Sequence, residues 1–252
     1  MGSLHGMRAL VTGGARGIGA AICVELAGEG AHVAVNDLPS ESDGGSRVVS
    51  RMLELGVDAC LVPGDLESVE ECYRVVIETT RNLGGLDILV NNAGGPFGQV
   101  SFEEMTEGQY DTVLAVNLKA SFFMSQAAAP HLRRSARGRI VNLASEVFFV
   151  GHELMAAYAA SKGGIIGLTR SLARALAPSV TVNAVAPGPI TTARLMEEPW
   201  FRETGEMHLA RIPLGRWGTP QDVARAVVFL VGPGGDWITG EVLSINGGVV
   251  MA

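Results

Sequence analysis

Two side chains four residues apart could do acid–base chemistry. Tyr158 and Lys162 lie in the run Ala156–Lys162, which is rich in good helix formers. On a helix, residues four apart share a face, so the ammonium of Lys162 would lie beside the phenol of Tyr158. A nearby cation favours phenolate, which makes tyrosine a base for alcohol oxidation and an acid for ketone reduction. Such a pair also occurs by chance on protein surfaces, so other residues must decide.

Two further polar residues favour the chemical interpretation. Ser145 follows a predicted strand, thirteen residues before the tyrosine, where its hydroxyl could hold the oxygen of a substrate. Asn117 lies within a predicted helix, an environment that asparagine disfavours, so its presence there needs a reason. Together, Asn117, Ser145, Tyr158 and Lys162 are the candidate catalytic residues.

A glycine-rich loop near the start of the chain predicts a dinucleotide site. Gly13, Gly17 and Gly19 follow a predicted strand and open the predicted helix Ile18–Gly28. A backbone that approaches pyrophosphate closely cannot carry Cβ, and a helix N-terminus offers N–H groups to the phosphates. An ordinary glycine turn can mimic the pattern, but the strand–loop–helix context favours the cofactor.

The residue at the end of the second predicted strand bears on the choice of cofactor. Asp37 could accept hydrogen bonds from the adenosine ribose and would repel a 2′-phosphate. Arg16, inside the glycine loop, could instead attract that phosphate. Because a carboxylate at the ribose should outweigh a cation on a mobile side chain, we expect NAD to be preferred, with NADP as the alternative.

Two more loops should reach the same edge of the sheet, since both follow predicted parallel strands. Asp65 and Leu66 follow the third strand, and Asp65 could meet the adenine amino group. Asn91, Ala93 and Gly94 follow the fourth, where small residues would let the cofactor lie against the backbone. Asn91 could also be a structural residue that hydrogen-bonds its own loop.

Strand-like and helix-like segments alternate along the chain, which indicates βαβ crossovers and a parallel sheet. We expect an α/β fold of Rossmann type: a doubly wound parallel sheet of about seven strands with helices on both faces. The whole chain, 1–252, forms one domain, with a loop over Pro39–Ser46 and a substrate-covering flap near 189–211. The predicted strands are Arg8–Thr12, His32–Asp37, Ala59–Val62, Ile88–Asn91, Arg139–Leu143, Thr181–Ala186 and Val242–Ile245, and the predicted helices include Ile18–Gly28, Arg47–Leu55, Val69–Leu83, Tyr110–Leu132 and Ala156–Leu176.

Charge and composition argue against several other classes of protein. A formal net charge of -7 disfavours a nucleic-acid partner, because such proteins usually carry a basic stripe. No apolar run is long enough for a membrane helix, and the first residues lack the pattern of a signal peptide. The cysteines are three in number, without metal-ligand spacing, and no histidine pattern suggests a metal site. We expect a cytoplasmic protein that binds neither membrane nor metal.

The motifs taken together resemble the short-chain dehydrogenase/reductase family, in its compact single-domain branch. The resemblance runs over nearly the whole chain and rests on Thr12–Gly19, Asn91–Gly94, Asn117, Ser145, Tyr158–Lys162 and Pro187-Gly188. It implies that Tyr158 is the acid–base residue, that Lys162 assists it and holds the nicotinamide ribose, that Ser145 binds the reacting oxygen, and that Asn117 keeps a water for proton relay. It also implies a homotetramer or homodimer built on the long helices, and a nicotinamide loop that includes Pro187, Gly188, Ile190 and Thr192.

The substrate itself is less well specified. Glu146, His152 and Pro189 are candidate substrate contacts, and Leu195, Met196, Trp200, Phe201 and Met207 of the flap could add an apolar wall. We expect an oxidoreductase that moves a hydride between NAD(H) and a secondary alcohol or its ketone. Two alternatives remain: an NADPH-dependent 3-oxoacyl-type ketone reductase, and a non-catalytic dinucleotide-binding sensor. An enoyl reductase would usually carry a longer tyrosine–lysine spacing.

Overall fold

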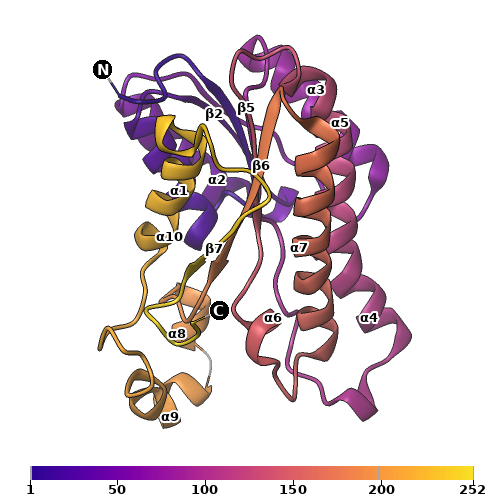
Figure 1. Ribbon diagram of the computed structural model, residues 1–252, viewed down its shortest axis with the longest axis vertical. Coiled ribbons are helices and arrows are strands. Elements are labelled where there is room, and N and C mark those ends of the chain that lie inside the picture. The colour runs from indigo at the N-terminus through magenta and orange to yellow at the C-terminus, as the bar shows by residue number, and fades with distance from the viewer. Residues whose placement is uncertain (1, 198, 252) are drawn as a thin grey trace.

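A parallel β-sheet of seven strands runs through the centre of the molecule (Figure 1). The computed structural model describes residues 2–197 and 199–251, and within the helices near the flap it leaves the side chains of Arg194, Pro199, Trp200, Arg202 and Thr204 undescribed. The strand order is β3-β2-β1-β4-β5-β6-β7, so the crossover direction reverses between β1 and β4. The strands are β1 (Arg8–Thr12), β2 (His32–Asn36), β3 (Ala59–Leu61), β4 (Ile88–Asn91), β5 (Gly138–Leu143), β6 (Val180–Pro187) and β7 (Val242–Ile245). The expected fold class is confirmed.

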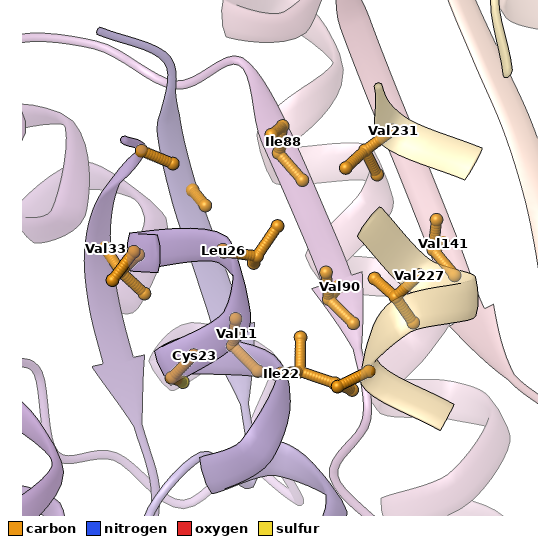
Figure 2. Packing of buried hydrophobic residues seen from close by; sticks show 14 of the residues in the cluster. Val11, Ile22, Cys23, Leu26, Val33, Ile88, Val90, Val141, Val227 and Val231 are labelled. Carbon is orange, nitrogen blue, oxygen red and sulfur yellow. The ribbon is translucent and has the colours of Figure 1, made fainter. Parts of the chain in front are cut away.

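Alternation along each strand divides the core into two layers. Ala9 and Val11 of β1 face one side of the sheet, while Leu10 between them faces the other, as the two-residue period of a strand requires. Ile88 and Val90 of β4 belong to the first layer and are drawn with it in Figure 2. Because both faces are covered, all these side chains are almost completely buried.

Helices cover both faces of the sheet. The cluster of Figure 2 packs under α1, α2 and α10, and the opposite cluster packs under α3, α5 and α7. The main helices are α1 (Gly17–Gly28), α2 (Ser42–Glu54), α3 (Val69–Leu83), α4 (Glu107–Leu114), α5 (Ala120–Leu132), α7 (Ala156–Leu176) and α10 (Pro220–Val231), and the shorter α6 (Val147–Val150), α8 (Ala193–Glu197) and α9 (Pro199–Leu209) lie together at one end of the molecule.

The ends of several predicted strands shift slightly. The strand predicted over His32–Asp37 ends at Asn36, which places Asp37 in the loop that follows. The strand predicted over Ala59–Val62 ends at Leu61, and β5 and β6 begin one residue earlier than expected. Strand ends are defined by hydrogen bonds to neighbours, which a hydropathy pattern does not show.

The helix predicted over Tyr110–Leu132 is helical throughout, but the expectation of a regular α-helix is wrong in its middle. The segment consists of α4, a π-helical turn η3 (Ala115–Lys119) and α5. Asn117 explains the interruption, because its side-chain amide donates to the carbonyl of Val113, the acceptor that its own backbone N–H would use in an α-helix. Such single turns are frequent at functional sites.

The loop predicted over Pro39–Ser46 is also wrong, since a 3₁₀ turn η1 (Pro39–Glu41) leads directly into α2 at Ser42. Two glycines weaken helix propensity here, but Gly45 packs so closely on Leu61 that a Cβ would lie 2.5 Å from its Cδ1. Packing therefore overrides propensity. Helix α10 was not predicted, although a Thr219–Asp222 capping box marks its start.

The predicted flap contains α8 and α9.

No helix among residues 2–197 and 199–251 is long and apolar enough to cross a membrane. Over the same residues, no group of three histidine, cysteine or acidic side chains is placed to hold a metal ion.

Candidate active site

The glycine loop is shaped by backbone conformations that favour glycine. Gly13 and Gly17 have φ of 63° and 54°, in the left-handed region. At Gly19 a Cβ would lie 2.0 Å from the carbonyl oxygen of Gly13, so only glycine lets α1 start so close to β1. Ile18 packs against the core below. At its glycines the loop therefore exposes bare backbone at the carboxyl end of β1.

Two motif residues to which the sequence assigned no role, Thr12 and Asn92, hold this loop in place. The side-chain amide of Asn92 donates to the carbonyls of Thr12 and Gly13, both at 2.9 Å. The hydroxyl of Thr12 in turn accepts from the N–H groups of Asn92 and Ala93, both at 3.0 Å. The loops after β1 and β4 are thus joined by four hydrogen bonds. The two adjacent asparagines were visible in the sequence, but only Asn91 was predicted to contact the cofactor.

Asp37 follows β2 and points back to the glycine loop. Its carboxylate accepts from the N–H groups of Ala15 and Leu38, both at 2.9 Å. The exposed guanidinium of Arg16 lies 3.3 Å from the carboxylate of Glu41 in η1. Arg16, the cation of the glycine loop, is therefore paired with Glu41. The sequence did not indicate this pair, because Pro39–Ser46 was predicted to be an irregular loop.

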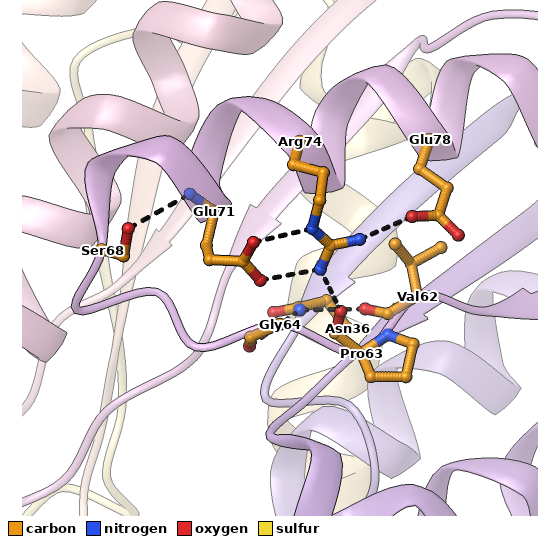
Figure 3. Close-up of polar contacts among 8 residues, drawn as sticks. All are labelled: Asn36, Val62, Pro63, Gly64, Ser68, Glu71, Arg74 and Glu78. Atoms are coloured by element: carbon orange, nitrogen blue, oxygen red, sulfur yellow. Dashed lines mark hydrogen bonds and ion pairs between the residues drawn. The ribbon is translucent and has the colours of Figure 1, made fainter.

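The loop after β3 is held by side chains of α3 and β2, as Figure 3 shows. Arg74 of α3 donates to Glu71, to Glu78 and to the carbonyl of Pro63. The amide of Asn36 donates to the carbonyls of Val62 and Gly64. These contacts fix the exposed Asp65, whose carboxylate accepts from the N–H of Glu67 at 3.0 Å, and the buried Leu66 next to it.

Asn91 is buried under the sheet edge. Its amide donates to Asn142 Oδ1 at 2.8 Å and to Ser125 Oγ at 3.1 Å. The side chain therefore ties β4 to β5 and α5, and only the backbone of Asn91 faces the loop. This arrangement matches the structural alternative for Asn91, although its partners come from neighbouring elements and not from its own loop.

Asn117 and Gly94 form a second close contact behind the site. The Asn117 side chain accepts from the N–H of Gly95 at 3.1 Å and donates to the carbonyl of Gly95 at 2.9 Å. A Cβ on Gly94, whose φ is 142°, would lie 2.3 Å from Asn117 Oδ1. The π turn thus clamps the loop after β4, and the asparagine is fully buried.

Tyr158 and Lys162 lie on one face of α7, as predicted. Lys162 Nζ lies 5.5 Å from the centre of the Tyr158 ring and donates to the carbonyl of Leu143 at 2.7 Å. Leu143 ends β5, two residues before Ser145, so Lys162 brings α7 to the loop that carries the serine. The ammonium is buried, and burial lowers the pKa of Lys162 to about 7.

Ser145 and Glu146 occupy the turn between β5 and α6. The Ser145 hydroxyl accepts from the N–H of Val147 at 3.3 Å and is mostly buried. The backbone of Glu146 donates to the carbonyl of Pro187 at 3.0 Å, which joins this turn to the end of β6. Burial raises the pKa of the Glu146 carboxyl to about 7.

The loop after β6 is held by Gly218. Its N–H donates to the Pro189 carbonyl at 3.1 Å, and its carbonyl accepts from the backbone and hydroxyl of Thr191. Ile190 is buried on the same contact, while Thr192 accepts from the N–H of Leu195 at the start of α8. A Cβ on Gly17 would lie 3.5 Å from the Thr192 methyl, so this loop reaches the glycine loop.

The remaining substrate candidates differ in their surroundings. Pro189 is half-buried within the loop just described. His152 is exposed, and its Nδ1 accepts from the N–H of Leu154 at 3.2 Å, which gives it a local role in its turn. The side chain of Trp200 falls outside the described residues. Phe201 packs on Trp217 with ring centres 5.1 Å apart.

The residues at this edge fit a dinucleotide. Helix α1 starts without a capping side chain and without an acid in its first turn, so its N-terminal N–H groups are left for a ligand. Glycines bare the adjacent backbone, and loops from β1, β2, β3, β4, β5 and β6 surround it, at the edge where such sheets bind nucleotides. Tyr158 and Lys162 stand on the far side of the β1–β4 switch.

Comparisons with known proteins agree with this geometry. The family model described as enoyl-(acyl carrier protein) reductase matches residues 13–250. The 3-oxoacyl-(acyl-carrier-protein) reductase FabG of Staphylococcus aureus is 41% identical over 244 residues, which cover 96% of this chain and 98% of the relative. The chain belongs to the short-chain dehydrogenase/reductase family. It is therefore an NAD(P)-dependent oxidoreductase that acts on an alcohol or its ketone.

Other members of the short-chain dehydrogenase/reductase family show the same likeness. The hydroxynaphthalene reductase-like protein Arp2 of Metarhizium robertsii is 39% identical, with 98% of this chain and 96% of the relative covered. A short chain dehydrogenase from Burkholderia cenocepacia, solved in complex with NADP, has a TM-score of 0.91 at 40% identity, covering 98% and 99% of the two chains. A metagenomic blue fluorescent protein in complex with NADPH has a TM-score of 0.92 at 35% identity, covering 99% and 100%.

Proposed function

We propose that this enzyme interconverts a ketone and a secondary alcohol, with Tyr158, Lys162, Ser145 and Asn117 as its catalytic residues. The contact of Lys162 with Tyr158 and with the end of β5 carries the proposal, because it brings the acid–base helix to the serine turn. Ser145 holds the substrate oxygen, and Tyr158 donates a proton to it during reduction. The cationic form of Lys162 stabilises the phenolate left behind, and the reverse steps oxidise the alcohol.

The bound dinucleotide supplies or accepts the hydride. Its pyrophosphate would lie on the N–H groups of α1 near Gly13, Gly17 and Gly19, and its adenosine near Asp37, Asp65 and Leu66. Ala93, Gly94 and the backbone of Asn91 would line its middle. Its nicotinamide would rest on the loop of Pro187, Gly188, Ile190 and Thr192, with Lys162 at the ribose. Asn117 clamps Gly94-Gly95, which keeps a substrate-side water and the cofactor in register.

We further propose that NAD(H) is preferred over NADP(H). A 2′-phosphate on the adenosine ribose would meet the Asp37 carboxylate and, beside it, Glu41. Arg16, the cation of the glycine loop, is already paired with Glu41. An acid at the ribose and a loop cation that is already paired favour the unphosphorylated cofactor.

NADPH-dependent reduction of a 3-oxoacyl substrate is the second candidate. It is favoured by the names of the Staphylococcus and Burkholderia relatives and by the presence of Arg16 in the loop. The four-residue spacing of Tyr158 and Lys162 favours a carbonyl substrate over an enoyl one.

One assay tests both candidates. Nicotinamide absorbance is followed with NADH and NADPH in parallel, over simple ketones, hydroxyketones, sugars and 3-oxoacyl thioesters. Turnover that is faster with NADH on a ketone supports the first candidate, and selective NADPH turnover of the thioester supports the second. Absence of turnover with every substrate, while NADH still binds, would support the alternative of a non-catalytic dinucleotide-binding sensor.

Oligomer, domain and location remain predictions. We propose a single domain that forms a homotetramer or homodimer through the α4–α5 and α7 faces, in the cytoplasm. Phe122 of α5 and Tyr110 of α4 support a contact there, because both are partly exposed. The mass in solution, measured by light scattering, tests the assembly.

A further inference from the structure

The carboxyl of Glu146 is packed between two loops of the site. Glu146 directly follows Ser145, and its backbone N–H donates to the carbonyl of Pro187 at 3.0 Å. Its side chain reaches the next residue of that loop, since a Cβ on Gly188 would lie 2.9 Å from Glu146 Oε2. The acid therefore lies where the serine turn meets the nicotinamide loop of the proposed function.

This carboxyl lacks the partners that buried acids normally have. Glu146 Oε2 is buried and finds no hydrogen-bond donor among the described residues. Desolvation alone raises its pKa to about 7, and no described cation lowers it. A buried polar group without a partner costs free energy, which suggests that a ligand supplies the missing hydrogen bond.

We propose that Glu146 determines specificity by hydrogen-bonding a substrate hydroxyl one or two carbons from the reacting carbonyl, so that hydroxyketones and the corresponding diols are the substrate class. The inference rests on the proposed function, in which Ser145 holds the carbonyl oxygen. Consecutive Cα atoms lie about 3.8 Å apart, so Ser145 and Glu146 are close enough for one small molecule to contact both residues.

A hydroxyl suits this acid better than an ammonium does. Near neutral pH the carboxyl is partly protonated, and an ammonium could pair only with its ionised form. A hydroxyl can donate to the carboxylate or accept from the carboxylic acid, so it is bound in both states. An apolar substituent would leave the carboxyl unpaired and would be selected against.

The test compares matched substrates in matched variants. The ratio of kcat/KM for 3-hydroxy-2-butanone to that for 2-butanone is measured, and likewise for 4-hydroxy-2-butanone, with the preferred cofactor. Because a hydroxyl also changes carbonyl reactivity, the ratio in each variant is compared with the ratio in the wild type. Glu146→Leu should lower at least one ratio tenfold or more, whereas Glu146→Gln, which keeps a donor and an acceptor, should lower it less. Glu153→Leu, an exposed acid of the same segment, is the charge-matched control and should leave both ratios unchanged.

Each outcome is decisive. If both kcat/KM ratios stay at the wild-type value in Glu146→Leu while 2-butanone is still reduced, the role of Glu146 is overturned and the proposed function stands. Failure of the wild type to reduce any ketone overturns the proposed function and this inference with it. Glu146→Ala replaces the leucine variant if the latter does not fold, as judged by thermal melting and NADH binding.

Discussion

Tyr158 and Lys162 have separate tasks in the proposed chemistry. The phenol carries the proton. The ammonium of Lys162, which donates to the carbonyl of Leu143, is held at a fixed position near that phenol. The two tasks can be separated experimentally, because loss of the hydroxyl leaves the ring and the lysine in place.

Tyr158→Phe should lower kcat by about 10²- to 10⁴-fold, because no other described side chain is proposed to donate the proton. NADH binding, followed by fluorescence titration, should stay within a few-fold of wild type. Tyr73→Phe, which removes a hydroxyl from the exposed face of α3, is the control and should retain its kcat. Near-normal turnover of the Tyr158 variant would overturn the mechanism.

Glu41→Gln should shift the cofactor preference toward NADPH, because it frees Arg16 to meet a 2′-phosphate. The ratio of kcat/KM for NADPH to that for NADH is expected to rise roughly 3- to 10-fold, since an exposed ion pair contributes only about 1 kcal/mol. Arg16→Gln in the same background should reverse the rise. Glu54→Gln, on the exposed side of α2, is the control. An unchanged ratio would mean that Arg16 does not reach the cofactor.

At the scale of elements, the clamp between η3 and the loop after β4 should be intolerant of small changes. Gly94→Ala would place a methyl group 2.3 Å from Asn117 Oδ1 and would force alanine to φ 142°. We expect the free energy of unfolding to fall by about 2 kcal/mol or more. Gly98→Ala is the matched control, because Gly98 has φ 108° but no atom within 4 Å of its Cβ. Urea unfolding of the two variants separates clash from backbone strain, and equal losses would contradict the clamp.

Sequence patterns predicted regular elements well and irregular ones poorly. The buried strands were found to within a residue or two, because continuous apolar runs between turns leave few alternatives. The interruption at Asn117 could not be seen, since it depends on a side chain that competes for a specific carbonyl. The start of α2 was missed because Gly45 is selected for its contact with Leu61 and not for helix formation.

The candidate site was predictable in its residue types but not in its support. Spacing placed Tyr158 beside Lys162 and glycines at the start of α1. No pattern indicated that Asn92 would bridge two loops or that Arg16 would pair with Glu41, since both contacts join segments distant in the fold or misassigned as loop. Asn91 is a different case. The sequence placed it correctly in the loop after β4, but its side chain bonds neighbouring elements of the fold and does not face the loop.

For the whole molecule, two buried groups should shape stability against pH in opposite directions. Glu146 has a folded pKa of about 7, above its ordinary 4.5, so the folded state holds more protons between these values and stability falls as pH rises. Lys162 has a folded pKa of about 7, below its ordinary 10.5, so the unfolded state holds more protons there and stability rises with pH. Together the two groups predict that the free energy of unfolding passes through a minimum near pH 7.

Urea unfolding from pH 5 to pH 10 checks this expectation. Relative to wild type, Glu146→Gln should remove the decline below pH 7, and Lys162→Met should remove the rise above it. Parallel curves for either variant and the wild type would contradict the corresponding pKa. The cofactor-free protein is the form to measure, since ligand binding would add its own linkage.

The strand order has a consequence for biosynthesis. The register pairs Ala9 of β1 with Ile88 of β4, 79 positions later, so one edge of β1 stays open until β4 has left the ribosome. At ordinary elongation rates that interval lasts roughly 4 to 16 s. During it the nascent chain exposes a strand with one unpaired edge and an apolar centre, Ala9–Val11, and an exposed apolar edge of this kind favours aggregation. A chaperone that shields Ala9–Val11 until Ile88 emerges should therefore raise the yield of folded enzyme.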